Sequence, residues 1–163
     1  MPQQYMHYTT ANIHTNAPLA LLGPKWDQLL AEARSLSSAG QHAIAIIIAA
    51  AAGEWATELV LERLMDAAKD HSKSVRDLEE MSERLLITWS FEAERVLEAF
   101  HDLTGEHPDR QSWWEDWLWS RRQRHDIAHR GVLTADAATA KKCIDVAALH
   151  IGYLTEVVKR QAP

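Results

Sequence analysis

Apolar residues recur at intervals of three or four along most of this chain, and this spacing is typical of helices that bury one face. Within residues 18–38 the apolar positions include Leu22, Trp26 and Leu30. Residues 41–69 start with a nearly continuous apolar run and become amphipathic later, which predicts a long central helix. No segment alternates apolar and polar residues as a half-buried strand does. The pattern therefore predicts an all-α bundle of roughly four to six helices in a single domain.

Glycine and small polar residues mark the breaks between these helices. Residues 37–40 (Ser-Ser-Ala-Gly) predict a turn after the first helix. A third helix is predicted over residues 74–87, and after a break the helical pattern continues over residues 91–101. Gly105 is placed to end that helix.

The last two predicted helices carry recognisable end signals. Residues 112–115 (Ser-Trp-Trp-Glu) fit a capping box at the start of a helix, and Gly131 is placed to stop it. Thr134 is expected to cap a final helix that extends to about Arg160. The apolar stripe predicted for this final helix consists of Ala137, Ala140, Ile144, Ala147, Ala148, Ile151, Leu154 and Val158.

Composition narrows the class of protein. Apolar residues make up 47% of the 163 residues and charged residues 25%, as in one soluble globular domain. Residues 1–16 are polar and are expected to form a flexible arm, so the helical domain is predicted over residues 17–163. The chain shows no signal-peptide pattern, and it has one cysteine, Cys143, which fits a reducing cytoplasm. The most hydrophobic stretch, residues 43–52, is shorter than the ~20 residues of a membrane-spanning helix. No membrane is therefore expected as a partner.

The distribution of charged residues indicates a candidate functional site near the end of the chain. The net charge is −6, so bulk electrostatics do not favour nucleic acid. Residues 119–142 are the exception, because they hold six cations and only two carboxylates, Asp126 and Asp136. The cations of this basic cluster are Arg121, Arg122, Arg124, Arg130, Lys141 and Lys142.

Residues 124–131 (Arg-His-Asp-Ile-Ala-His-Arg-Gly) combine a phosphate-binding cation with a proton-transfer group. RNA cleavage without metal needs a base for the 2′-OH, an acid for the leaving 5′-oxygen and a cation for the phosphate. His129 can act as base or acid, and Arg124 can hold phosphate with its planar guanidinium. His125 can orient either partner. One imidazole cannot flank both sides of a phosphate in one turnover, so the chemistry favours a homodimer.

A straight helix does not bring the two main residues together. Arg124 and His129 are about 140° apart around such a helix, whereas His125 and His129 share one face. The helix must therefore loosen near His129, and Gly131 favours this.

These residues resemble the motif of the HEPN superfamily (higher eukaryotes and prokaryotes nucleotide-binding domains). The resemblance covers residues 44–154, about two thirds of the chain. It includes Asp-Leu-Thr-Gly at residues 102–105, a Trp-rich helix, residues 124–131 and a long amphipathic helix.

The resemblance implies a four- or five-helix bundle that dimerises through the motif face. Many such proteins are metal-independent endoribonucleases that act as toxins, phage-defence effectors or RNA-processing enzymes, while others are inactive binding modules. Carried over, the catalytic pair is Arg124 and His129, with His125 in the variable polar position. A subfamily that pairs with a nucleotidyltransferase antitoxin has a tyrosine where this chain has Gly131, which argues against that type of control.

Other residues near the motif are predicted to have supporting functions. Arg121, Arg122, Arg130 and Trp119 are predicted to bind substrate, and Trp119 is the tryptophan expected to be most exposed. The neighbouring Trp113, Trp114 and Trp117 are predicted to pack. Glu54 follows the apolar run of the central helix and is expected to pair with Arg124 or another motif residue, and Asp126 is a further possible support.

A zinc hydrolase is a remote alternative. His125 and His129 have the spacing of a zincin helix, and His150 or Glu156 could supply a third ligand. Asp126 is shorter than the glutamate of such enzymes, and no metal or other cofactor is predicted. His42, His71, His101, His107 and His150 are scattered along the chain and are expected at the surface or at helix ends. The main hypothesis is thus an RNA-cleaving HEPN homodimer, with an antitoxin or regulatory protein as a possible partner, and the alternative is a non-catalytic nucleotide- or protein-binding module.

Overall fold

The computed structural model describes residues 23–68, 75–77 and 90–161, and within these ranges the regular elements are all helical. They are α1 (Gly23–Ser38), α2 (His42–Ala67), α4 (Glu94–Thr104), the 3-10 turn η2 (Pro108–Arg110), α5 (Trp114–Arg130) and α6 (Ala137–Gln161). The all-α prediction is confirmed. The predicted N-terminal arm and most of the predicted third helix lie outside the described residues.

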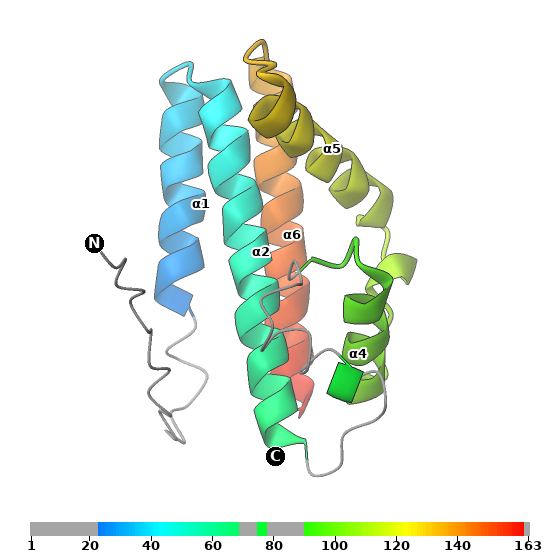
Figure 1. Ribbon diagram of the computed structural model, residues 1–163. Coiled ribbons are helices and arrows are strands. Elements are labelled where there is room, and N and C mark those ends of the chain that lie inside the picture. The colour runs from blue at the N-terminus through cyan, green and yellow to red at the C-terminus, as the bar shows by residue number, and fades with distance from the viewer. Residues whose placement is uncertain (1–22, 69–74, 78–89, 162–163) are drawn as a thin grey trace, which may run out of the picture.

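Three long helices, α1, α2 and α6, lie side by side, and α5 leans across the first half of α6 (Figure 1). α2 occupies the centre because it packs against α1, α6 and α5. Its first half is lined with small residues, and Ala45, Ala49, Ala52 and Ala56 are fully buried, so neighbouring helices approach closely. By length and composition alone α2 could cross a membrane, but half of its most apolar stretch is buried inside the bundle.

The interior divides into two clusters of apolar side chains. The larger cluster surrounds the fully buried Phe91, Phe100, Leu61 and Leu154. The smaller one consists of Ala43, Ile46, Ile127, Ala140 and Cys143, with Ile47, Trp119 and Ala135 against it. It joins the start of α2 and the start of α6 to the last turns of α5. The motif end of α5 is therefore anchored at one end of the bundle, beside the α1–α2 turn (Figure 1).

The glycines end the helices as predicted, but two of the predicted N-caps are wrong. Gly40, Gly105 and Gly131 all have positive φ. α5 begins at Trp114 after η2 and has no side-chain cap, so the predicted capping box of residues 112–115 does not form. α6 is capped by Asp136 rather than Thr134: the Thr139 N–H donates to Asp136 Oδ1 at 2.7 Å, and this bond lowers the pKa of the carboxyl. Both residue types cap well, and Asp136 is the one that directly precedes the helix.

The prediction that His150 lies at the surface or at a helix end is wrong. It is fully buried in the core. Its Nε2 is 2.8 Å from Thr57 Oγ1, and its ring contacts those of Phe91, Trp113 and Trp117. Burial, together with the positive charge of Arg121, lowers the pKa of His150 to about 3. The imidazole is therefore neutral at pH 7. Trp113 and Trp117 are buried in the same cluster, which confirms that they pack.

Candidate functional site

The structure brings together Arg124 and His129, the catalytic pair that the sequence predicts. Arg124 Nη1 lies 3.5 Å from His129 Nε2 on the outside of α5. The rings of His125 and His129 are adjacent, with their centroids 4.7 Å apart. His125 and His129 are exposed, and Arg124 is about one third exposed at 31%. All three side chains can thus be reached from solvent.

The last turn of α5 is wider than a regular α-helical turn. The Gly131 N–H donates to the carbonyl oxygen of Asp126, five residues back, where a regular α-helix would use the fourth. The Val132 N–H donates to the same carbonyl at 3.3 Å. Gly131 takes the left-handed conformation (φ 65°) that ends the helix. This agrees with the expectation that the helix loosens next to His129.

Glu54 of α2 connects the motif to the bundle. Its Oε1 forms an ion pair with Arg121 Nη1 and lies 4.0 Å from Arg124 Nη2. The predicted pairing of Glu54 with a motif residue is therefore present, and two arginines share the carboxylate. Because Arg121 is the closer partner, Arg124 is oriented by Glu54 but is not tightly held.

Arg121 itself does not fit the substrate-binding function that the sequence suggested. It is only 8% exposed, and its Nε donates to Glu92 Oε2 at 2.9 Å in addition to the Glu54 contact. Its guanidinium also lies 5.9 Å from the ring of Trp117. Two carboxylates and an aromatic ring already surround this cation, so its contribution is to hold α5 against α2 and the turn before α4.

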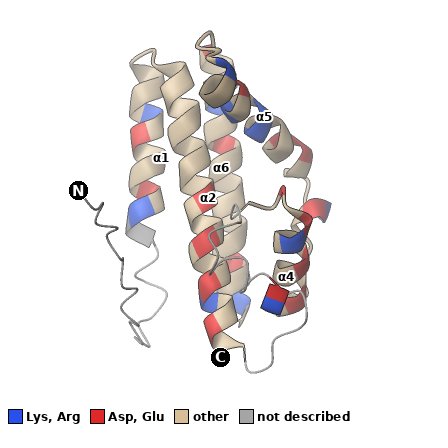
Figure 2. Cartoon of the chain, in the orientation of Figure 1, with Lys and Arg blue, Asp and Glu red and all other residues tan. Residues whose placement is uncertain are grey.

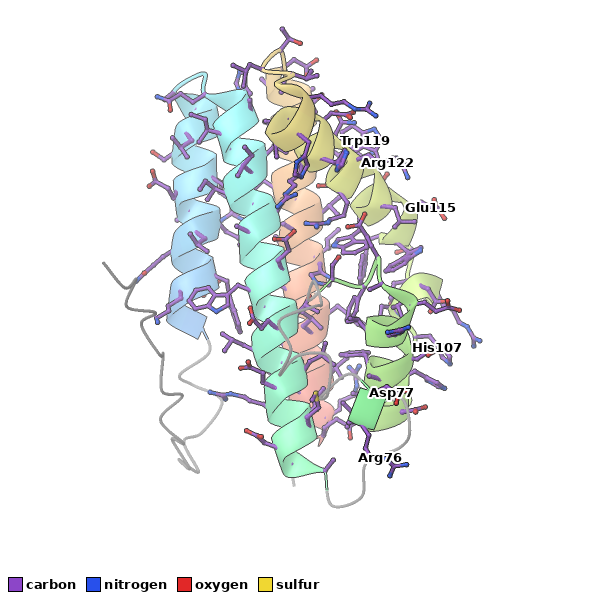
Figure 3. All side chains as sticks on the ribbon, in the orientation of Figure 1. Arg76, Asp77, His107, Glu115, Trp119 and Arg122 are labelled. Atoms are coloured by element: carbon purple, nitrogen blue, oxygen red, sulfur yellow. The ribbon has the colours of Figure 1, made fainter. Side chains whose placement is uncertain are left out.

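Figure 2 shows the basic residues of α5, and Figure 3 labels Arg122 and Trp119 on this helix. Arg122 is exposed and has no ion-pair partner within the described part of the chain. Arg130 is also exposed, and its Nη1 contacts Asp126 Oδ1 at 3.0 Å. Asp126 therefore forms its ion pair with Arg130 and does not support the Arg124–His129 pair.

Trp119 is partly covered rather than freely exposed. One side of it packs on the smaller core cluster, and Lys142 Nζ from α6 lies 4.7 Å from the ring centroid. Lys142 is in turn paired with Asp116 at 2.6 Å. Stacking of a base on Trp119 would require Lys142 to move.

An open groove with a volume of about 320 Å³ runs along this part of α5. Its wall consists of Glu92 and six α5 residues, Arg121, Arg122, Arg124, His125, Asp126 and Arg130. Four cations and two carboxylates thus face the same space. Arg124 links the groove to His129, which lies just outside it.

Comparison of the chain with known proteins identifies no relative. No protein-family model matches the chain, and no match was found among curated proteins or solved structures. What the site can do therefore follows from its own side chains.

The ligand set of the zinc alternative is not assembled. Within the described ranges, no group of three or more His, Cys, Asp or Glu side chains could hold a metal ion. Of the two suggested third ligands, His150 is buried beside Thr57 on α2, and Glu156 is paired with Lys159 at 2.7 Å. His125 and His129 remain as a pair on the surface of α5.

Sequence reasoning missed one residue of the groove, Glu92. It lies in the turn between residues 90 and 93, and its only sequence signal is Ser90, which caps that turn: the Glu92 N–H donates to Ser90 Oγ at 3.3 Å. Phe91, fully buried between them, fixes the turn in the core. No pattern along the chain indicates that this turn meets α5.

Proposed function

We propose that this protein is a metal-independent endoribonuclease of the HEPN type, acting as a toxin, a phage-defence effector or an RNA-processing enzyme. The observation that carries the proposal is the 3.5 Å approach of Arg124 Nη1 to His129 Nε2 on an exposed surface beside a basic groove. A pair of this kind is what phosphodiester cleavage by a neighbouring 2′-OH needs.

In the proposed reaction His129 takes the proton of the 2′-OH, and the 2′-oxygen attacks the adjacent phosphorus. The bond from phosphorus to the 5′-oxygen breaks, and that oxygen leaves with a proton supplied by an acid. The products are a 2′,3′-cyclic phosphate and a 5′-hydroxyl. Arg124 stabilises the charge on the phosphate through two N–H donors, and Glu54 keeps its guanidinium near His129. His125, next to the His129 ring, supports the orientation of the pair or shares in the proton transfer.

A homodimer would supply the second proton-transfer group. The exposed apolar side chains Val132 and Leu133 follow the motif directly, and Leu133 is 71% exposed. Ile44, 48% exposed, is in the first turn of α2, and the start of α2 lies at the same end of the bundle as the end of α5 (Figure 1). An apolar surface beside the pair supports self-association there, which would bring two copies of the motif to one cleft.

The test is cleavage of a mixed RNA pool in EDTA by the wild type, Arg124→Ala and His129→Ala, with identification of the product ends. The proposal expects cleavage that survives EDTA, leaves 2′,3′-cyclic phosphates and disappears in both variants. His101→Ala, which changes an exposed histidine of α4, is the matched control and should cleave like the wild type. Cleavage that persists in His129→Ala would contradict the proposal.

One observation favours a second candidate, a non-catalytic module that binds a nucleotide or a protein. Arg121, Arg130, Lys141 and Lys142 each have a carboxylate partner, so much of the basic cluster is internally neutralised. Tight binding of a long RNA would have to break several of these pairs. If the wild-type protein binds nucleotides but cleaves no RNA at any pH between 5 and 8, this candidate replaces the nuclease.

A further inference from the structure

The groove beside Arg124 contains a carboxylate that phosphate binding does not explain. Glu92 faces a space that Arg122, Arg124 and His125 also line. A carboxylate repels phosphate, so its presence among these cations disfavours a groove filled by phosphates alone. It favours a ligand that brings N–H donors to one side of the groove and a phosphate to the other.

Glu92 is held in a fixed position. Its Oε2 accepts a hydrogen bond from Arg121 Nε at 2.9 Å and is 3.4 Å from Ser90 Oγ. Ser90 and Phe91 are both buried, and the Phe91 ring packs edge-on against Phe100 with centroids 5.0 Å apart. The side chain is therefore preorganised at the groove without help from a ligand.

The second oxygen of Glu92 is available. Within the described part of the chain no contact occupies Oε1, and the Glu92 side chain is 45% exposed. Oε2 accepts from Arg121 and from Ser90, and the Ser90 contact, at 3.4 Å, is long and weak enough for a ligand N–H to replace it. Glu92 can thus accept two parallel N–H bonds from one planar partner.

We propose that Glu92 forms a nucleobase subsite that selects guanine next to the cleaved phosphate. Guanine is the nucleobase whose Watson–Crick edge presents two neighbouring N–H donors, at N1 and N2, and these match the two oxygens of one carboxylate. The base and the phosphate of one nucleotide are attached to the same sugar, so a phosphate at Arg124 brings its base into the groove. The groove volume of about 320 Å³ is at the lower end of the range for small-ligand pockets, about 300–1,000 Å³, which suits one nucleotide.

This inference rests on the proposed ribonuclease function, and its test separates the two. The substrate is a uridine-rich oligoribonucleotide that contains a single guanosine, compared with versions that carry inosine or adenosine at that position. Inosine keeps the N1–H of guanine but lacks the N2 amino group. A bidentate base contact discriminates by roughly tenfold or more. Wild-type protein should therefore cleave beside guanosine about tenfold faster than beside inosine or adenosine.

Glu92→Gln should remove this preference while cleavage at uridines continues, because the amide presents a donor in place of one acceptor. Glu115→Gln is the matched control, since Glu115 is an exposed glutamate near the start of α5 and does not line the groove (Figure 3). It should keep the full preference for guanosine. The inosine comparison uses wild-type protein alone, so the inference stays testable even if Glu92→Gln fails to fold.

Binding of the same oligonucleotides with 2′-O-methyl sugars, followed by fluorescence anisotropy, gives a second readout that needs no cleavage. Guanosine-selective binding without any cleavage would support the subsite and overturn the nuclease proposal. Cleavage with equal rates beside guanosine, inosine and adenosine would overturn the subsite and leave the nuclease in place. Absence of both selective binding and cleavage would overturn both.

Discussion

Arg121 and Arg124 lie one turn apart on α5 and share the carboxylate of Glu54, yet their surroundings are opposite. Arg121 is buried between Glu54 and Glu92, whereas Arg124 reaches out of the bundle to His129. The same contrast holds for two histidines: His150 is buried against Thr57, and His129 is exposed. The difference shows that the bundle separates cations and imidazoles that are buried in the fold from those that solvent can reach.

The largest effect is expected for Arg124, the arginine that is proposed to act in RNA cleavage. Arg124→Ala should lower kcat for RNA cleavage by roughly 100- to 1,000-fold, the usual cost of losing one group that stabilises a transition state. The free energy of unfolding should change by less than about 0.5 kcal/mol, because the side chain is partly exposed and its Glu54 contact is long. Single-turnover kinetics and urea denaturation measure the two quantities.

Arg122→Ala serves as the comparator on the same helix. Arg122 is exposed and lines the groove but is not part of the Arg124–His129 pair, so its loss should raise KM severalfold and leave kcat nearly unchanged. Equal losses of kcat in the two variants would show that Arg124 is only one of several interchangeable cations.

Arg121→Ala should have the opposite profile, with the main effect on stability. It removes a buried guanidinium and leaves Glu54 and Glu92 without their shared partner. Breaking a buried ion pair costs about 3–5 kcal/mol, and the partial exposure of both carboxylates reduces this to roughly 2–3 kcal/mol. Urea denaturation of Arg121→Ala and of the charge-conserving Arg121→Lys measures this loss of free energy of unfolding. If Arg121→Ala unfolds at the wild-type urea concentration, the assignment of Arg121 to the fold is wrong.

Acid should destabilise the interior through His150. The pKa of this histidine is lowered to about 3 in the folded protein, so the unfolded chain, with a pKa near 6.5, binds a proton first. Above pH 6.5 both states are neutral and there is no cost. As the pH falls from 6.5 towards 3, the unfolded state gains protons and stability is lost, by about 1.4 kcal/mol between pH 7.5 and 5.5.

The measurement is the free energy of unfolding at those two pH values for wild type and His150→Gln. The variant removes the titration and keeps a polar group near Thr57, so its stability should depend less on pH by about 1.4 kcal/mol. His101→Gln, at an exposed histidine, should keep the wild-type pH dependence. An unchanged pH dependence in His150→Gln would mean that His150 is accessible to protons in the folded state.

Much of this arrangement is predictable from the sequence, and the exceptions have physical reasons. Helix positions follow from periodicity and glycines, and the pairing of Glu54 follows from its place directly after an apolar run. His150 was predictable as well, because it is three residues after Ala147 and four before Leu154, both buried on the same stripe. The spacing indicates burial, whereas the polar residue type favours the surface, and in this chain the spacing is the better guide.

The distinction between Arg121 and Arg124 was not predictable in this way. Along the chain they are equivalent cations in one basic cluster, and Glu92, which fixes Arg121, is 29 residues away in a turn. Only packing of the aromatic core around Phe91 brings that turn to α5. Long-range ion pairs of this kind depend on tertiary contacts that local patterns do not encode.

The smallest predicted effect concerns the turn that brings Arg124 to His129. Gly131 has φ 65°, and a side chain there would meet no neighbouring atom, so the cost of Gly131→Ala is backbone strain alone, about 1 kcal/mol of stability. Gly131→Asn should cost less, because asparagine tolerates the left-handed conformation. If the wide turn is what positions His129, the rate of RNA cleavage should fall in the order glycine, asparagine, alanine. A loss of stability in Gly131→Ala without any loss of rate would show that Arg124 and His129 meet independently of this turn, and that the flexible arginine side chain alone accounts for their contact.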